Sequence, residues 1–166
     1  MSSADISDTQ KLCDEIGRIM YEGDTAVQAM GITLDFIAPG EAGMSMRVRD
    51  DMTNMLGYGH GGFTFALADS VGGYACNSRN RKAVAQVAQI TYLAPAKAGD
   101  MLHAVGRETW LGKTYGMYDI SVTNQDGVRI AEFRSQCHNL NGRVIESLPS
   151  IDTEQSPPER TSPAVK

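Results

Sequence analysis

Two glycines in the stretch NMLGYGHGGFTFALADS, residues 54–70, stand where acyl-transfer chemistry would use them. Gly61 and Gly62 precede an apolar run, at the point where a helix would begin with unpaired backbone N–H groups and the positive end of its dipole. Such N–H groups stabilise the oxyanion that forms when a carbonyl is attacked, and glycine lets a substrate come close. A plain tight turn would explain the same pair, so the hypothesis depends on their position before the helix.

Asp69 is the only charged residue between Gly61 and Ser78. A buried, ionised and unpaired carboxylate is costly, so a carboxyl group in this setting needs a reason. One reason is structural, since the carboxylate can cap a neighbouring backbone group or pair with an Arg or Lys. The other is catalytic. Ser70, beside it, could orient a water, but a buried helical Ser commonly bonds back to the carbonyl one turn earlier.

The spacing of these residues separates the two parts of the site. Asp69 follows Gly61 by eight positions, which is about 12 Å along one helix. That is too far for both groups to act on one reacting carbonyl. An antiparallel copy of the helix from a second subunit would bring its Asp69 near the first Gly61. We therefore expect a homodimer with shared active sites.

The composition is that of a soluble globular domain. The chain has 166 residues, 42% of them apolar and 21% charged, and a net charge of −5, which argues against a general nucleic-acid surface or a membrane span. Its polar, acidic start lacks the features of a signal peptide, which predicts a cytoplasmic protein. Three widely spaced cysteines suit reduced thiols better than disulfides or a zinc site, so we expect no metal.

The hydrophobic pattern predicts one long helix among about six strands. A first amphipathic helix follows Ser7 and Asp8 and ends near Gly23. The remaining elements are a hairpin around Pro39-Gly40, an apolar helix from Gly62 to Asn77, and strands at Val84–Leu93, Met101–Trp110, Tyr115–Thr123 and Val128–Leu140. We expect an α+β domain over residues 31–146, in which an antiparallel sheet wraps around the central helix. A helical segment over 1–30 precedes it, and a disordered tail over 147–166 follows.

The order of these elements and several short motifs resemble the PaaI-type phenylacetyl-CoA thioesterases of the hotdog-fold superfamily. HGG followed by ALADS, with Asn54 six residues before His60, carries the resemblance, and YACNS, TYLAPAKAGD, GKTYGMYDISVTNQDG and AEFRSQCH extend it over roughly residues 31–140. The resemblance implies hydrolysis of aryl-acyl or related acyl-CoA thioesters, without a metal or a further cofactor, by a dimer of dimers.

The resemblance also implies roles for individual residues. The Gly61 N–H would polarise the thioester carbonyl, and the partner's Asp69 would act as nucleophile or as base for water. Asn54 matches a side chain that helps to hold the water or acyl group; the alternative is a loop Asn that tolerates an unusual backbone angle. His60 either contacts the bound thioester or fixes the glycine loop through its ring nitrogens.

The phosphates of CoA require cationic residues and free backbone donors. Lys113 and Thr114, in LGKTYG, are our candidates, although an ordinary hairpin turn explains them as well. The cluster RNRK, residues 79–82, is denser, but such a run is usually a solvated turn.

Two other functions fit an acyl-CoA-binding hotdog domain. An enoyl-CoA hydratase or dehydratase needs an acid and a base close together, and His60 and Asp69 are too far apart within one chain. A non-catalytic acyl-CoA-binding protein would normally carry an output module, and one short helix before Gly31 is too little for a helix-turn-helix domain.

Overall fold

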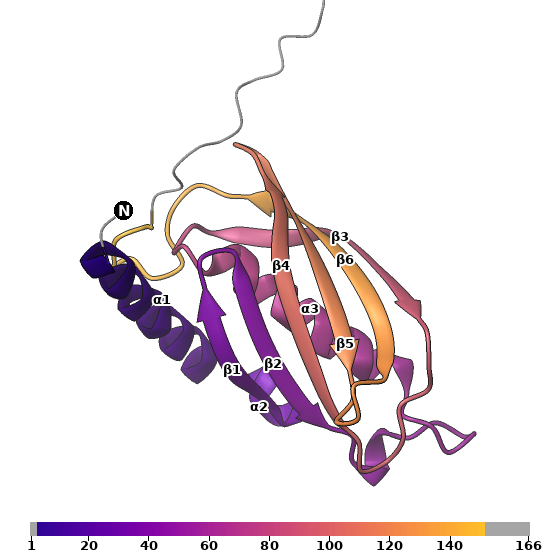
Figure 1. Ribbon diagram of the computed structural model, residues 1–166. Coiled ribbons are helices and arrows are strands. Elements are labelled where there is room, and N and C mark those ends of the chain that lie inside the picture. The colour runs from indigo at the N-terminus through magenta and orange to yellow at the C-terminus, as the bar shows by residue number, and fades with distance from the viewer. Residues whose placement is uncertain (1–2, 152–166) are drawn as a thin grey trace, which may run out of the picture.

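The computed structural model describes residues 3–151, in which a six-stranded antiparallel sheet curves around one helix (Figure 1). The strands lie in the order β1-β2-β4-β5-β6-β3. The elements, in chain order, are α1 (Ser3–Gly23), α2 (Thr25–Met30), β1 (Ile32–Ala38), β2 (Glu41–Arg47), the short 3-10 helix η1 (Asp50–Met52), α3 (Gly61–Asn77), β3 (Ala83–Tyr92), β4 (Met101–Leu111), β5 (Tyr115–Thr123) and β6 (Arg129–Asn139). The predicted α+β architecture is confirmed.

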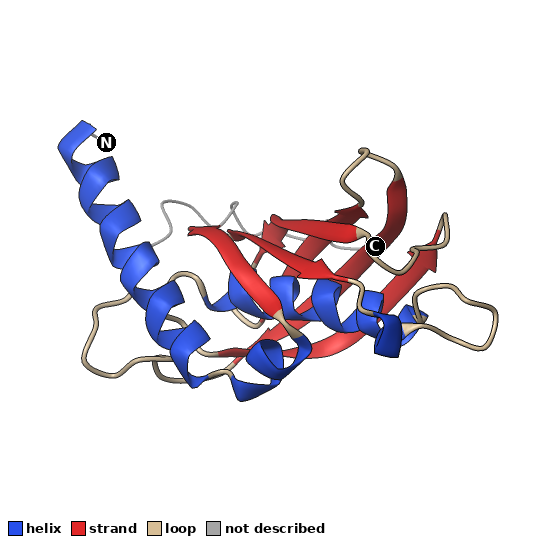
Figure 2. Cartoon of the chain, turned by 90° about the horizontal axis from the view of Figure 1, so that it is seen from below, coloured by secondary structure: helices blue, strands red, loops and turns tan. Residues whose placement is uncertain are grey.

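Helix α3 packs one face into the sheet and leaves the other face partly open. The helices lie along one side of the strands in Figure 2. Glycines permit the close packing: a Cβ on Gly106 of β4 would lie 2.7 Å from a methyl group of Val71. The opposite face carries Gly62, Ala66, Asp69 and Gly73, all partly or fully exposed. The apolar pattern of α3 predicted that every face of the helix is buried. Within one chain only the face toward the sheet is buried.

Helix α1 covers one edge of the sheet, that of β1. Gln10 Nε2 donates a hydrogen bond to the Ile37 carbonyl at 2.7 Å, and the Tyr21 hydroxyl donates one to the Ile32 carbonyl at 3.0 Å. Gly17 allows this approach, since a Cβ there would lie 2.6 Å from the Ile37 side chain. Side chains of α1 therefore take the place of a further strand at this edge.

The opposite edge, that of β3, is open in the described part of the chain. β3 pairs with β6 alone, and its residues from Val84 to Gln89 are exposed in both directions. Val87, for example, is 53% exposed. A strand of such length with a free edge and two uncovered faces is typical of an interface.

Two segments differ from the sequence interpretation. Helix α2 was not expected because it has only six residues, although Asp24 caps its start and Gly31, at φ 72°, ends it.

The predicted tail begins with residues that pack on the domain: Ile151 is 9% exposed and its N–H donates to the Arg79 carbonyl at 2.9 Å. The apolar side chains of Leu148 and Ile151 explain this attachment. The rest of that prediction, residues 152–166, lies outside the described residues.

Candidate active site

The start of α3 is fixed by His60, which is its N-cap residue. The backbone of His60 is extended, with φ −66° and ψ 127°, and its ring Nδ1 accepts a hydrogen bond from the Gly62 N–H at 3.0 Å. Because Nδ1 is the acceptor, the neutral ring carries its proton on Nε2. Of the two roles left open for His60, this geometry supports fixing the glycine loop, and Nε2–H remains as a donor.

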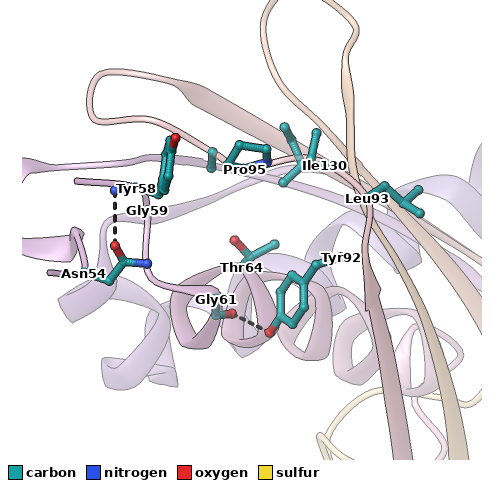
Figure 3. Close-up of a pocket in the computed structure, with 11 residues that line it drawn as sticks. Asn54, Tyr58, Gly59, Gly61, Thr64, Tyr92, Leu93, Pro95 and Ile130 are labelled. Carbon is teal, nitrogen blue, oxygen red and sulfur yellow. Dashed lines mark hydrogen bonds between the residues drawn. The ribbon is translucent and has the colours of Figure 1, made fainter. Parts of the chain in front are cut away.

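Gly61 keeps its N–H uncommitted. Among the described residues no acceptor bonds to that N–H, whereas the His60 N–H donates to the Met52 carbonyl and the Gly62 N–H to the His60 ring. The Gly61 carbonyl accepts a hydrogen bond from the Tyr92 hydroxyl at 2.9 Å (Figure 3). Burial raises the pKa of that hydroxyl, so it stays a donor at neutral pH. A backbone N–H without an acceptor among the described residues is therefore present at the position predicted for the oxyanion donor, and Tyr92 holds its residue in place.

Gly61 lines a pocket of about 480 Å³. Four segments form it: the loop before α3, the first turn of α3, the end of β3 with the following loop, and the start of β6 (Figure 3). Leu93, Pro95 and Ile130 give it an apolar wall, and Thr64 adds a hydroxyl close to Gly61. The pocket therefore offers polar groups at one end of an apolar surface, as a site for an acyl group requires.

Asn54 also lines this pocket, but its side-chain oxygen has a structural task. Oδ1 accepts hydrogen bonds from the Leu56 N–H at 2.9 Å and the Tyr58 N–H at 3.2 Å, which closes the loop that contains Gly57 at φ 77°. The amide nitrogen points away from these bonds (Figure 3). The loop role is thus present, and the nitrogen is left as a donor at the pocket.

Asp69 does not line this pocket, in keeping with the estimated separation of about 12 Å from Gly61. Its carboxyl is partly buried, no donor among the described residues bonds to it, and burial raises its pKa. Ser70 donates to the Ala66 carbonyl at 2.8 Å, so the expected bond to the preceding turn is confirmed. A single chain therefore holds the glycine loop and the aspartate apart.

Lys113 and Thr114 lie at the far end of the sheet from the pocket. The hairpin that carries them is bonded to Asn139, and the adjacent pairing runs from Tyr115 through His138 to Val84. Val84 and Tyr92 are eight residues apart on β3, roughly 26 Å. Within one chain the two residues are therefore not brought together with Gly61.

Tyr92 and Thr64 were missed by the sequence interpretation. Tyr92 reads as one more apolar residue at the end of a strand, and its bond to Gly61 joins positions 31 residues apart. Thr64 is 3% exposed and carried no signal beyond its position in the helix. In residues 3–151 no group of three or more His, Cys, Asp or Glu side chains is placed to hold a metal ion, and no helix is long and apolar enough to cross a membrane.

The chain is similar to known thioesterases. Residues 56–131 match the family model of the Thioesterase superfamily. The acyl-coenzyme A thioesterase PaaI of Escherichia coli (strain K12) is 39% identical over 125 residues, which cover 75% of this chain and 89% of that protein.

Solved structures extend the comparison to the whole fold. The E. coli PaaI protein from the phenylacetic acid degradation operon superposes with a TM-score of 0.80 at 36% identity, over 81% of this chain and 98% of that chain. A protein from Streptococcus mutans UA159, solved bound to acetyl CoA, gives a TM-score of 0.65 at 29% identity, over 68% of this chain and 90% of that chain.

The fold and the glycine loop at the start of its central helix define a hotdog-fold thioesterase. Within that class, the chain belongs to the PaaI-type acyl-CoA thioesterases. The family and the fold predicted from the sequence are confirmed.

Proposed function

We propose that the protein hydrolyses aryl-acyl CoA thioesters of the phenylacetyl type to the free acid and CoA. The observation that carries this proposal is the uncommitted Gly61 N–H at the start of α3, beside an apolar wall. The thioester carbonyl oxygen accepts a hydrogen bond from this N–H, and the helix dipole favours the negative charge that develops on it. The apolar wall receives the acyl group, and the phenylacetic acid operon of the E. coli relative supports an aryl group there.

The partner's Asp69 supplies the second part of the chemistry. Its carboxylate either attacks the acyl carbon or takes a proton from the attacking water. If the carboxylate attacks, the C–S bond breaks and a mixed anhydride forms, which water then hydrolyses to the free acid and the regenerated aspartate. If it acts as base, the water oxygen attacks the acyl carbon directly as the C–S bond breaks. In both routes the CoA sulfur leaves as thiolate and gains a proton. Partial burial, with no hydrogen-bonded partner in residues 3–151, leaves this carboxylate more basic than an exposed one. We propose that Asn54 Nδ2 and His60 Nε2 assist as donors at the carbonyl or the water.

The dimer that this chemistry needs is supported by two open surfaces. One is the free edge of β3 and the other is the uncovered face of α3 that carries Asp69. Helix α3 contacts β3 directly, so the two surfaces are neighbours in the fold and one antiparallel copy of the chain would cover both. The face of α3 is built from small residues around the carboxylate, which permits a close approach of the two helices.

Mixed dimers test the shared site. Asp69→Asn and Gly61→Pro chains are each inactive alone, but when they are refolded together one site of each mixed dimer receives an intact Gly61 and an intact Asp69. With random pairing about one quarter of all sites become active again. Mixed dimers, verified by mass, that release no thiol would refute the shared site.

A screen of aryl-, short- and long-chain acyl-CoAs for thiol release tests the activity and its acyl preference, with Asp69→Asn as the control. Crotonyl-CoA separates the other functions: loss of the enoyl absorbance without thiol release would indicate a hydratase. Binding of every acyl-CoA without turnover would indicate a binding protein.

We further propose a tetramer that forms through the outer face of the sheet, in a cytoplasmic protein. Trp110, Met117, Gln136 and Val87 are successive partners across β4, β5, β6 and β3, so their side chains share one face, and Trp110 is 46% exposed. Trp110→Arg should reduce the mass measured by light scattering from tetramer to dimer while thiol release is kept.

We also propose that Lys113 and Thr114 bind CoA phosphates. They lie beside the start of β3, and roughly 26 Å of that strand separates them from the Gly61 of their own chain. We therefore propose that they contact a CoA whose thioester is bound at Gly61 of the partner subunit. A Lys113→Gln variant should show a raised KM for acyl-CoA, and an unchanged KM would remove the lysine from the site.

A further inference from the structure

Cations without acidic partners gather at the end of α3 that is remote from Gly61. Arg79, the first residue of the loop after Ser78, forms a largely buried ion pair with Glu108 at 2.6 Å. Its neighbours Arg81 and Lys82 form no ion pair with a carboxylate of the described residues, and neither does Arg143. In a chain of net charge −5, such a gathering of unpaired cations needs a reason.

Asn80 builds the surroundings of these cations. It is fully buried, at φ 56°, and its Nδ2 donates to the Ile145 carbonyl at 2.9 Å and the Leu148 carbonyl at 2.8 Å, while its Oδ1 accepts from the Ile145 N–H at 2.8 Å. The Lys82 N–H donates to the Gly142 carbonyl at 3.2 Å. These bonds fasten the segment after β6 onto the loop after α3, so both are held in one arrangement.

A cleft of about 520 Å³ lies between these two segments. Arg81 comes from the loop after α3, and Arg143 comes from the segment after β6. The hydroxyl of Ser150 and the backbone at Asn141 and Gly142 add polar groups. Two guanidinium groups from separate segments, in a polar cleft with a fixed frame, suit the phosphates of a nucleotide.

The antiparallel helix pair places this cleft near the other subunit's thioester. The partner's α3 continues for eight residues beyond its Asp69 to Asn77, which is about 12 Å past the Gly61 that it faces. The partner's loop 78–82 therefore lies beyond the start of α3, outside the acyl pocket. The chain's own loop is remote from that pocket, because β3 separates them by roughly 26 Å.

We propose that Arg81 and Arg143 bind the phosphates of a CoA whose thioester is hydrolysed with the help of Asp69 from the same subunit. The carbonyl of that thioester is held by Gly61 of the other subunit. This assignment rests on the proposed function and adds the subunit from which the nucleotide is recognised. Each subunit therefore contacts two CoA molecules on opposite sides of the helix pair. Its Arg81 and Arg143 bind the nucleotide of one, and its acyl pocket receives the acyl group of the other.

Charge-removing variants test the phosphate contacts. Arg81→Gln and Arg143→Gln should each raise KM for an acyl-CoA about tenfold with kcat unchanged. They should act like wild type on the same acyl group carried by N-acetylcysteamine, which has no phosphate. Arg107→Gln is the matched control, because this exposed arginine pairs with Glu41 on another part of the sheet. An unchanged KM in both cleft variants would overturn the proposal.

Mixed dimers assign the subunit. In the pairing of Gly61→Pro with Asp69→Asn chains, the Gly61→Pro chain supplies the working Asp69. Adding Arg81→Gln to that chain should raise KM, and adding it to the Asp69→Asn chain should leave KM unchanged. The reverse pattern would overturn the assignment.

Calorimetric titration with CoA alone separates failure of this inference from failure of the proposed function. Weaker CoA binding by the arginine variants, in a protein that releases no thiol, would refute hydrolysis and support the cleft. Unchanged CoA affinity in both variants would refute the cleft whatever the turnover.

Discussion

The backbone donor at Gly61 can be tested by comparing a substitution that keeps the N–H with one that removes it. Gly61→Ala keeps the N–H but adds a Cβ that would lie 2.9 Å from Tyr92 Cζ and 3.0 Å from its hydroxyl oxygen, so the phenol ring must move and its bond to the Gly61 carbonyl is strained. Gly61→Pro adds the same Cβ, closes it through Cγ and Cδ onto the backbone nitrogen, and removes the N–H. Because both variants carry the Cβ beside Tyr92, the further loss in the proline variant reflects the missing N–H and the ring that replaces it.

The structure predicts that the proline variant folds. Proline is favoured at the first position of a helix, and the extended backbone of His60 is the conformation that a residue before proline prefers. The N–H that is removed bonds to no described residue, so no structural hydrogen bond is lost. Circular dichroism and gel filtration should therefore match wild type in both variants.

The expected loss of turnover follows from the role of the donor. Displacement of Tyr92 in Gly61→Ala should lower kcat about tenfold, and removal of an oxyanion donor should lower it by a further ~10²–10³-fold in Gly61→Pro. Thiol release at saturating acyl-CoA is the measurement. A Tyr92→Ala background removes the clash, so it should relieve most of the alanine effect and little of the proline effect. Equal turnover of the two Gly61 variants, in either background, would refute the donor.

Three further predictions concern Asp69, His60 and the C-terminal segment. Asp69→Asn should lower kcat by about 10²–10⁴-fold and keep CoA binding. Because burial raises the pKa of Asp69 in the folded state, its ionisation destabilises the fold, so the variant should also have a higher Tm at pH 8. This gain in Tm should disappear once the pH falls below the ordinary Asp pKa of about 3.9. For the same reason the acid limb of kcat/KM in wild type should lie above that value, and a limb at or below it would contradict the assignment. His60→Asn, which keeps a capping acceptor, should retain more stability than His60→Ala, and equal Tm values would show that the cap contributes nothing. Deletion from residue 152 should leave thiol release unchanged, whereas deletion from Ser150 removes part of the cleft and should raise KM; identical kinetics of the two truncations would argue against that cleft.

The sequence predicted the sheet and the central helix because each strand is bounded by turn formers and α3 is strongly apolar. It also predicted that Gly61 and Asp69 act from different chains, because helix rise alone separates them. The sequence pattern could not predict contacts between distant positions: the Tyr92 bond to Gly61 spans 31 residues, and the Asn80 bonds to Ile145 span 65 residues. Asn80 looked like part of a solvated turn, and no periodic pattern marks a side chain that fastens two loops.

The exposed β3 has a consequence for how the protein behaves on dilution. A separated chain would present an unpaired strand edge with Val84 and Val87 uncovered, which is a template for aggregation. Its stability is then tied to protomer concentration, so melting temperature should rise with concentration. In the dimer that we propose, the surface that completes the site also covers β3, so activity and solubility should be lost together below its dissociation constant.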